Sequence, residues 1–87
     1  MAEIIIPGQF RQYSTVDAIF MTNERTAGEA LEDLTRTHPM LKSYIFESDH
    51  TIKGFVNIFV DGEMIEDLST PVFPSTRIQI ILAVAGG

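Results

Sequence analysis

Residues 77–84 read Arg-Ile-Gln-Ile-Ile-Leu-Ala-Val and are nearly all apolar. Such a run is typical of a strand in the middle of a sheet, because a central strand is covered well enough to tolerate apolar residues in succession. A central strand needs a neighbour on each side. The rest of this chain must therefore supply several more strands.

The N-terminal part of the sequence predicts the first two of these strands. Residues 3–6 are mostly β-branched and stop at Pro7-Gly8, which is typical of a strand followed by a turn. Residues 14–21 form a second, less regular candidate strand. Together they predict an N-terminal hairpin.

A second hairpin is predicted further along the chain. Residues 55–60 read Phe-Val-Asn-Ile-Phe-Val and are followed by Asp61-Gly62, the strongest short hairpin signal in a sequence. Residues 63–65 would form the returning strand.

One helix is predicted between the two hairpins, over residues 26–37. Thr26 and Glu29 have the spacing of a capping box, in which the Thr26 hydroxyl accepts from the Glu29 amide and the Glu29 carboxylate reaches back to the Thr26 amide. Proline at position 39 ends the helix at His38. The apolar positions follow helical spacing: Ala27, Ala30, Leu31 and Leu34.

The remaining segments predict little regular structure. We expect a short helical turn over residues 40–43 with extended chain to residue 46, an exposed loop over 47–53, and a mostly irregular stretch over 68–76 with one tight helical turn near Val72 and Phe73. The element order predicts an α+β fold: a mixed sheet of four to five strands with one main helix packed across one face.

Composition limits the function of this single 87-residue domain. The absence of cysteine excludes disulfides, thiolate metal sites and a nucleophilic thiol. A net charge of −6 with scattered basic residues argues against nucleic-acid binding and favours a basic protein partner. No apolar stretch approaches the length that spans a membrane, so we expect no membrane association and a cytoplasmic location.

The last five residues, Ala83-Val84-Ala85-Gly86-Gly87, predict a flexible tail (83–87) behind a folded domain (1–82). Two glycines lack Cβ atoms, so they can enter a narrow enzyme channel and adopt any backbone angle there. The carboxylate of Gly87 is then a candidate reactive group. The alternative is that Gly-Gly is an ordinary frayed terminus.

This tail, the segment from Phe55 to Glu63 and the order of elements together resemble the ubiquitin-like β-grasp sulfur carriers. The sequence is most similar to the small subunit of molybdopterin synthase and to carriers that serve cysteine or siderophore biosynthesis, and it also resembles the thiamine-pathway carrier. The resemblance implies a β-grasp fold and a carrier or small synthase subunit rather than an enzyme in its own right.

The same resemblance implies a set of partners. An E1-like adenylating enzyme would join the Gly87 carboxylate to AMP from ATP, with Gly86 threading its channel. A sulfur donor of the desulfurase or rhodanese type would then displace AMP and leave a thiocarboxylate for a sulfur-accepting synthase. A processing protease is a further possible partner, since some relatives are made with residues beyond the glycines.

Strand alternation predicts a partner-binding face. Phe59 and Ile81 would be neighbouring apolar residues on the sheet face opposite the helix, and Ala83, Val84 and Ala85 would lie extended in a partner groove, held by main-chain hydrogen bonds. The alternative is that a loop or the segment around residues 40–46 covers the first two side chains.

No bound cofactor or metal is expected. Asp61, Glu63, Glu66 and Asp67 lack the ligand spacing of a hard-cation loop and are better interpreted as a solvated hairpin end. Two other function classes stay open beside the sulfur carrier. One is a ubiquitin-like modifier that is conjugated to other proteins through Gly87, and the other is a β-grasp binding module with an inert tail.

Overall fold

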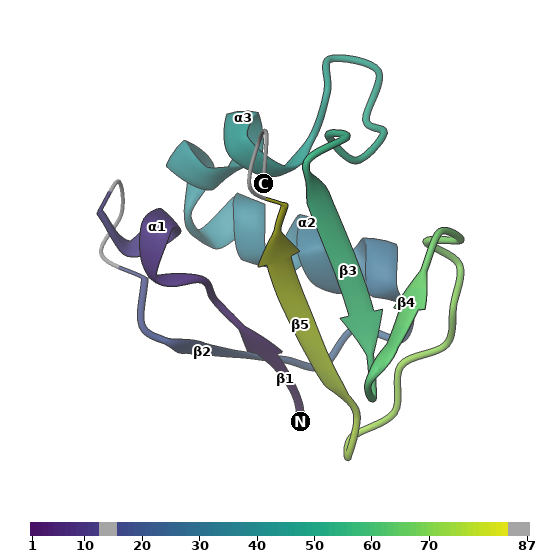
Figure 1. The fold of residues 1–87 in the computed structure, drawn as a ribbon. Helices are drawn as coiled ribbons and strands as arrows, with labels where there is room; N and C mark the ends of the chain where they lie inside the picture. Colours follow the sequence, from purple (N-terminus) through teal and green to yellow (C-terminus); the bar gives the residue numbers. More distant parts are fainter. Residues whose placement is uncertain (13–15, 84–87) are drawn as a thin grey trace.

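A five-stranded mixed sheet forms the centre of the fold in the computed structural model, which describes residues 1–12 and 16–83 (Figure 1). The sheet has the order β2-β1-β5-β3-β4. β1 and β5 run parallel, and the other neighbouring pairs are antiparallel. The strands are Ala2–Ile5 (β1), Ile19–Thr22 (β2), Val56–Val60 (β3), Glu63–Ile65 (β4) and Arg77–Leu82 (β5). The predicted α+β class and the central place of the last strand are confirmed.

One face of this sheet is covered by the long helix Ala27–Thr37 (α2), which lies behind the strands in Figure 1. Short helical segments complete the same layer: Gly8–Arg11 (α1), Pro39–Leu41 (η1) and Lys42–Ile45 (α3). The core forms between the two layers, from side chains on alternate positions of the strands and at helical spacing on α2. Its fully buried large apolar members are Ile4, Leu31, Leu34, Leu41, Ile45 and Ile78.

The N-terminus of α2 is capped as predicted, with one difference. The Glu29 amide donates to Thr26 Oγ1 at 3.1 Å, but the Glu29 carboxylate accepts from the Thr26 hydroxyl at 3.2 Å. The loop that leads to β5 satisfies two further amides of the first turn. Ala27 N donates to Thr70 O at 3.0 Å, and Gly28 N donates to Leu68 O at 2.8 Å. Glycine suits this close approach, because a Cβ on Gly28 would lie 3.1 Å from the Leu68 carbonyl oxygen and the loop would have to move by a few tenths of an ångström.

The predicted Asp61-Gly62 hairpin turn joins β3 to β4. Both residues have positive φ, 49° and 88°, as the favoured two-residue turn requires. Asp61 also ties the turn to β5: its amide donates to Arg77 O at 2.8 Å, and its carboxylate accepts from Arg77 N at 2.9 Å.

The N-terminal hairpin pairs as predicted, but its second strand is shorter. β2 begins at Ile19 rather than at residue 14, and α1 precedes it. Pro7 is the N-cap of α1, and this helical turn buries Phe10 in the core. The need to bury that aromatic ring explains why the connection is helical rather than extended. Residues 13–15, within the predicted strand, lie outside the described residues.

Two other local predictions need correction. The predicted turn over residues 40–43 is part of η1 and α3, which continue to Ile45 because Leu41 and Ile45 both pack into the core. The helical turn predicted near Val72 and Phe73 is wrong. Residue 71 instead forms an isolated bridge with Thr26, and the chain turns two residues later, where Thr76 N donates to Phe73 O at 2.9 Å.

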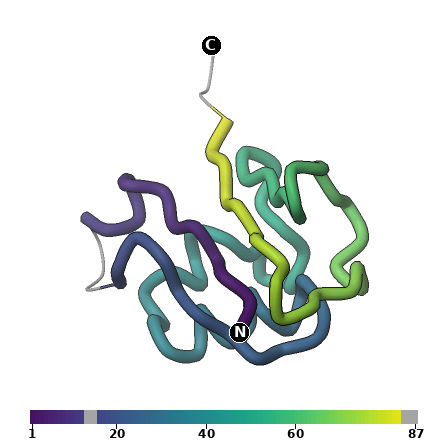
Figure 2. The backbone as a smooth tube through the Cα atoms, turned by 90° about the horizontal axis from the view of Figure 1, so that it is seen from below, coloured from purple at the N-terminus to yellow at the C-terminus, as the bar shows by residue number. Residues whose placement is uncertain are grey.

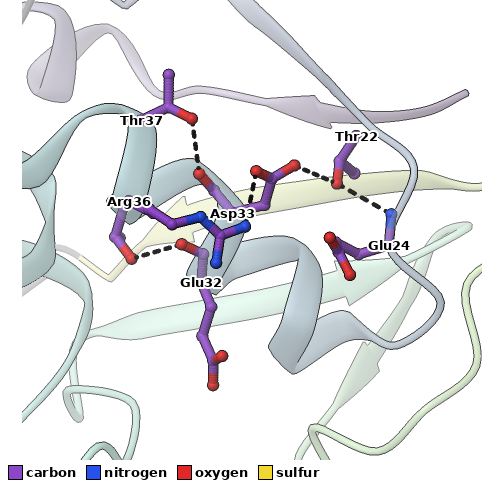
Figure 3. Close-up of polar contacts among 7 residues, drawn as sticks. Thr22, Glu24, Glu32, Asp33, Arg36 and Thr37 are labelled. Atoms are coloured by element: carbon purple, nitrogen blue, oxygen red, sulfur yellow. Dashed lines mark hydrogen bonds and ion pairs between the residues drawn. The ribbon is translucent and has the colours of Figure 1, made fainter.

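A small polar network holds the end of β2 against α2 (Figure 3). The buried Thr22 hydroxyl donates to Asp33 Oδ2 at 2.8 Å and accepts from Glu24 N at 3.2 Å. The other oxygen of Asp33 accepts from Arg36 at 3.1 Å. Each polar atom of this contact therefore has a partner, as a buried hydroxyl requires.

Candidate functional site: the end of β5 and the open face of the sheet

The predicted reactive tail continues directly from β5. Ala83, the last described residue, is exposed, and its amide donates to Phe55 O at 2.7 Å. The other predicted tail residues, Val84, Ala85, Gly86 and Gly87, lie outside the described residues. The tail is thus attached to the central strand of the sheet, at the end that leads away from β1 in Figure 2.

The other end of β5 is firmly held. Arg77 is bonded through its main chain to Asp61, and its guanidinium Nε lies 3.2 Å from the Glu3 carboxylate. Thr76, just before the strand, is buried, and its hydroxyl accepts from Phe73 N at 2.9 Å. Both neighbouring strands pair with β5 in this region.

The predicted neighbours Phe59 and Ile81 do lie on the same face of the sheet. Phe59 is half-buried on β3 opposite Gln79, and Ile81 lies two residues further along β5, so the two side chains are diagonal neighbours. Ile81 is 44% exposed. Their role in partner binding stays a prediction.

The alternative that residues 40–46 cover these side chains does not match the fold. Leu41 and Ile45 belong to the core between the sheet and α2, on the opposite side of the sheet. Within the described part of the chain, Figure 1 shows no helix in front of the sheet. We call this surface the open face.

The open face contains apolar residues that the sequence reasoning missed. Met64 of β4 is 57% exposed and lies directly opposite Phe59. Ile5 lies on the other side of Gln79, and the exposed Ile19 follows on β2. One cross-strand row therefore spans the sheet: Met64, Phe59, Gln79, Ile5 and Ile19. The two-residue turn at Asp61-Gly62 fixes the pairing of residues 59 and 64, so Met64 could have been found from the sequence.

The acidic residues around the second hairpin have structural partners. Asp61 accepts from the Arg77 amide, and Asp67 accepts from both the amide and the hydroxyl of Ser69, at 2.9 and 2.6 Å. The hydroxyl bond, and then the amide bond, lower the pKa of Asp67 below its usual range. Across residues 1–12 and 16–83, no group of three or more His, Asp or Glu side chains is arranged to hold a metal ion.

Comparison with known proteins identifies the family. The family model described as "ThiS family" matches residues 4–87, which is nearly the whole chain. The chain belongs to the ThiS family. With that family it belongs to the ubiquitin-like sulfur carriers of the β-grasp fold, as the sequence resemblance predicted. No curated protein sequence matches it significantly.

Solved structures of this fold are similar over almost the full length. A chain in the crystal structure of the Amycolatopsis orientalis BexX/CysO complex is 22% identical with a TM-score of 0.87, and each chain is covered completely. Mycobacterium tuberculosis CysO is 21% identical with a TM-score of 0.85, covering 97% of this ThiS-family chain and 100% of the other. SAMP1 from Haloferax volcanii is 21% identical with a TM-score of 0.83, at 99% and 98% coverage. These likenesses show the β-grasp fold.

Among the described residues of this ThiS-family chain, none of the helices is long and apolar enough to cross a membrane.

Proposed function

We propose that this ThiS-family protein carries sulfur as a thiocarboxylate on Gly87. A carboxylate is a poor electrophile, so an E1-like enzyme first joins it to AMP from ATP and releases pyrophosphate. The outer sulfur of a persulfide on a desulfurase or rhodanese-type donor then attacks the acyl carbon, AMP leaves, and an acyl disulfide forms. A thiol attacks the donor's sulfur in this acyl disulfide, so the S–S bond breaks, a disulfide with the donor forms and the thiocarboxylate is released. The resulting thiocarboxylate donates its sulfur to a biosynthetic synthase. Gly87 acts either as encoded or after a protease has exposed it.

The observation that favours this proposal is the combination of Gly86-Gly87 with a ThiS-family domain that contains no cysteine. Without a thiol, the chain cannot form a persulfide on a side chain, so a covalently carried sulfur must be attached at another position. The terminal carboxylate can provide it. The carrier is then a protein co-substrate or a small synthase subunit rather than an enzyme. It holds no cofactor of its own. Because its activation by the partner enzyme consumes ATP, a cytoplasmic location fits this role.

We also propose that the open face around Phe59 and Ile81 binds the partner enzymes. An exposed isoleucine beside a half-buried phenylalanine and an exposed methionine forms an apolar surface, and such surfaces are typical of protein interfaces when they are contiguous. Acidic residues make up most of the charge elsewhere, so a partner with a basic rim would be attracted. Residues 83–85 would lie extended in the partner's groove.

The test is reconstitution with a candidate adenylating enzyme from the same genome, ATP and a sulfur donor. Intact-protein mass spectrometry should show the mass gain of one oxygen-to-sulfur exchange, located at Gly87 by fragmentation. A chain without Gly86 and Gly87 is the negative control. Gly86→Ala should lose most of the reactivity with an unchanged melting temperature, because the methyl group would obstruct the channel. No mass gain with any adenylating enzyme of the genome would refute the proposal.

A second candidate function is conjugation to other proteins through Gly87. Its support is that the likeness extends to SAMP1 from Haloferax volcanii, which another solved structure names the small archaeal modifier protein 1. Conjugates of higher mass in cell extracts that vanish on deletion of Gly87 would favour it. A chain whose activity survives deletion of both glycines would instead be a binding module with an inert tail.

A further inference from the structure

The two edges of β5 are paired over different lengths. On the β3 side, pairing continues to Leu82 opposite Val56, and the Ala83 amide still bonds to Phe55 O. On the β1 side, the register ends at Ile5 opposite Gln79. The last part of β5 therefore has a neighbouring strand on one side only.

The reason lies in the sequence of β1. In a parallel ladder, every second residue bonds to the neighbouring strand with both its N–H and its C=O. Glu3 is such a residue, since its amide donates to Thr76 O at 3.1 Å, and Ile5 is the next. Position 7 would follow, but proline has no N–H, and the Pro7 carbonyl already accepts from Phe10 N at 3.0 Å. Pro7 thus turns β1 away from β5 and starts α1.

This arrangement leaves three main-chain groups of β5 without a strand partner among the described residues. They are the Ile80 carbonyl and both the amide and the carbonyl of Leu82, which by alternation face the β1 side. We call them the half-edge. Figure 2 shows β1 and β5 separating toward this end of the strand. Unpaired groups on a sheet edge are a template for another strand.

We propose that the half-edge binds an extended, uncharged apolar segment of the adenylating enzyme that activates Gly87, by addition of a strand to the sheet. This inference rests on the proposed function. The occupant follows from the surroundings of the half-edge: the exposed Ile81 and the half-buried Ile5 flank it, and residues 78–85 contain no charged side chain. The half-edge is also continuous with the tail, so a strand bound there would fix the direction in which residues 83–87 enter the active site.

Amide hydrogen exchange measured by NMR tests this inference in the unmodified chain. In the free protein, the Leu82 amide should exchange at least about tenfold faster than the Ile80 and Ile81 amides, which face β1 and β3 in the ladder. With the adenylating enzyme bound, the exchange of Leu82 should slow by at least about tenfold. Unchanged exchange at Leu82 in a complex that still forms the thiocarboxylate would overturn the inference alone. Failure to form the thiocarboxylate would overturn the proposed function, and the inference with it.

A matched pair of variants separates the main chain from the side chain. Leu82→Pro removes the half-edge amide but no bond of the β3 ladder, whereas Leu82→Ala keeps the amide. Leu82→Pro should raise the KM of the adenylating enzyme for the carrier about tenfold, the effect of losing one hydrogen bond, and Leu82→Ala should raise it less than about threefold. Equal effects of the two would contradict the proposal. If Leu82→Pro does not fold, the exchange measurement on the unmodified chain decides.

Discussion

The two halves of β5 differ in how firmly the fold holds them. The first half, from Arg77 to Gln79, is paired on both sides, is tied to Asp61 and Glu3, and contains the fully buried Ile78. Beyond the Ile80 amide, the second half is paired with β3 alone, and the strand is followed by the exposed Ala83. A single strand thus combines a firmly paired anchor with an accessible end, which suits the role proposed for the tail.

The largest expected effect compares Ile78 with Leu82. Ile78→Ala should lower the free energy of unfolding by about 3 kcal/mol, because it removes apolar atoms from a site with 0% exposure. Leu82→Ala should lower it by only about 1 kcal/mol, because Leu82 is half-buried. Urea denaturation of both variants measures the difference. Similar losses would mean that the two halves are equally anchored.

The next effect concerns the loop that leads into the anchored half. Gly28→Ala should destabilise the protein by about 1 kcal/mol, although alanine is the better helix former, because the new Cβ would press on the Leu68 carbonyl that bonds to the residue 28 amide. Thermal unfolding checks it. Ala30→Gly serves as a reference, because its loss of stability measures the combined cost of lower helix propensity and lost packing at a buried position of α2. A stabilised Gly28→Ala variant would show that the loop can move away.

A similar or slightly smaller effect should come from the polar network in Figure 3. Thr22→Val keeps the shape of the buried side chain but removes its hydrogen bond to Asp33, so we expect a loss of about 1 kcal/mol. Thr37→Val is a matched control, because the Thr37 hydroxyl bonds to the Asp33 main-chain carbonyl at an exposed position. Equal denaturation midpoints of the two variants would contradict a stabilising role for the network.

The smallest effect is a dependence of the folded state's stability on acid pH, which arises in the two loops that contain Asp49 and Asp67. Hydrogen bonds from the hydroxyl and amide of Thr51 lower the pKa of Asp49, and those from Ser69 lower the pKa of Asp67, in each case below the usual 3.8. A lowered pKa in the folded state stabilises it above pH 3.8, and that contribution is lost as the pH falls through the folded-state pKa.

An NMR titration of the carboxyl carbons measures both pKa values in one sample. Ser69→Ala should return the pKa of Asp67 toward its usual value and leave that of Asp49 unchanged. A pKa of Asp67 that does not respond to this substitution would show that the Ser69 hydroxyl is not its cause.

The sequence alone was enough to predict the parts of the fold that depend on a strong local pattern. The helix cap at Thr26, the Asp61-Gly62 turn and the apolar run of β5 were all confirmed, because in each a short stretch determines the conformation. The sequence missed α1, where the burial of Phe10 against distant parts of the chain overrides the local tendency of residues 8–11.

The candidate site was predictable to a similar extent. Alternation placed Phe59 and Ile81 on one face, but the neighbours of that face depend on strand order. Ile5 and Ile19 join it only because β1 pairs in parallel with β5, which no local pattern determines. The half-edge likewise depends on Pro7, which lies two residues after the end of β1 and faces the last part of β5 only because of this strand order. The tail residues 84–87 lie outside the described residues, so their predicted role depends on the sequence and the family alone.

The parallel pairing of β1 with β5 also has a mechanical consequence. A force that pulls the tail away from the body of the protein acts along β5 and loads its ladder bonds in shear, so several of them must break together rather than one after another. Under the proposed function, an enzyme that draws the tail into a narrow channel would therefore leave the domain folded outside, as a stop that sets the depth of entry.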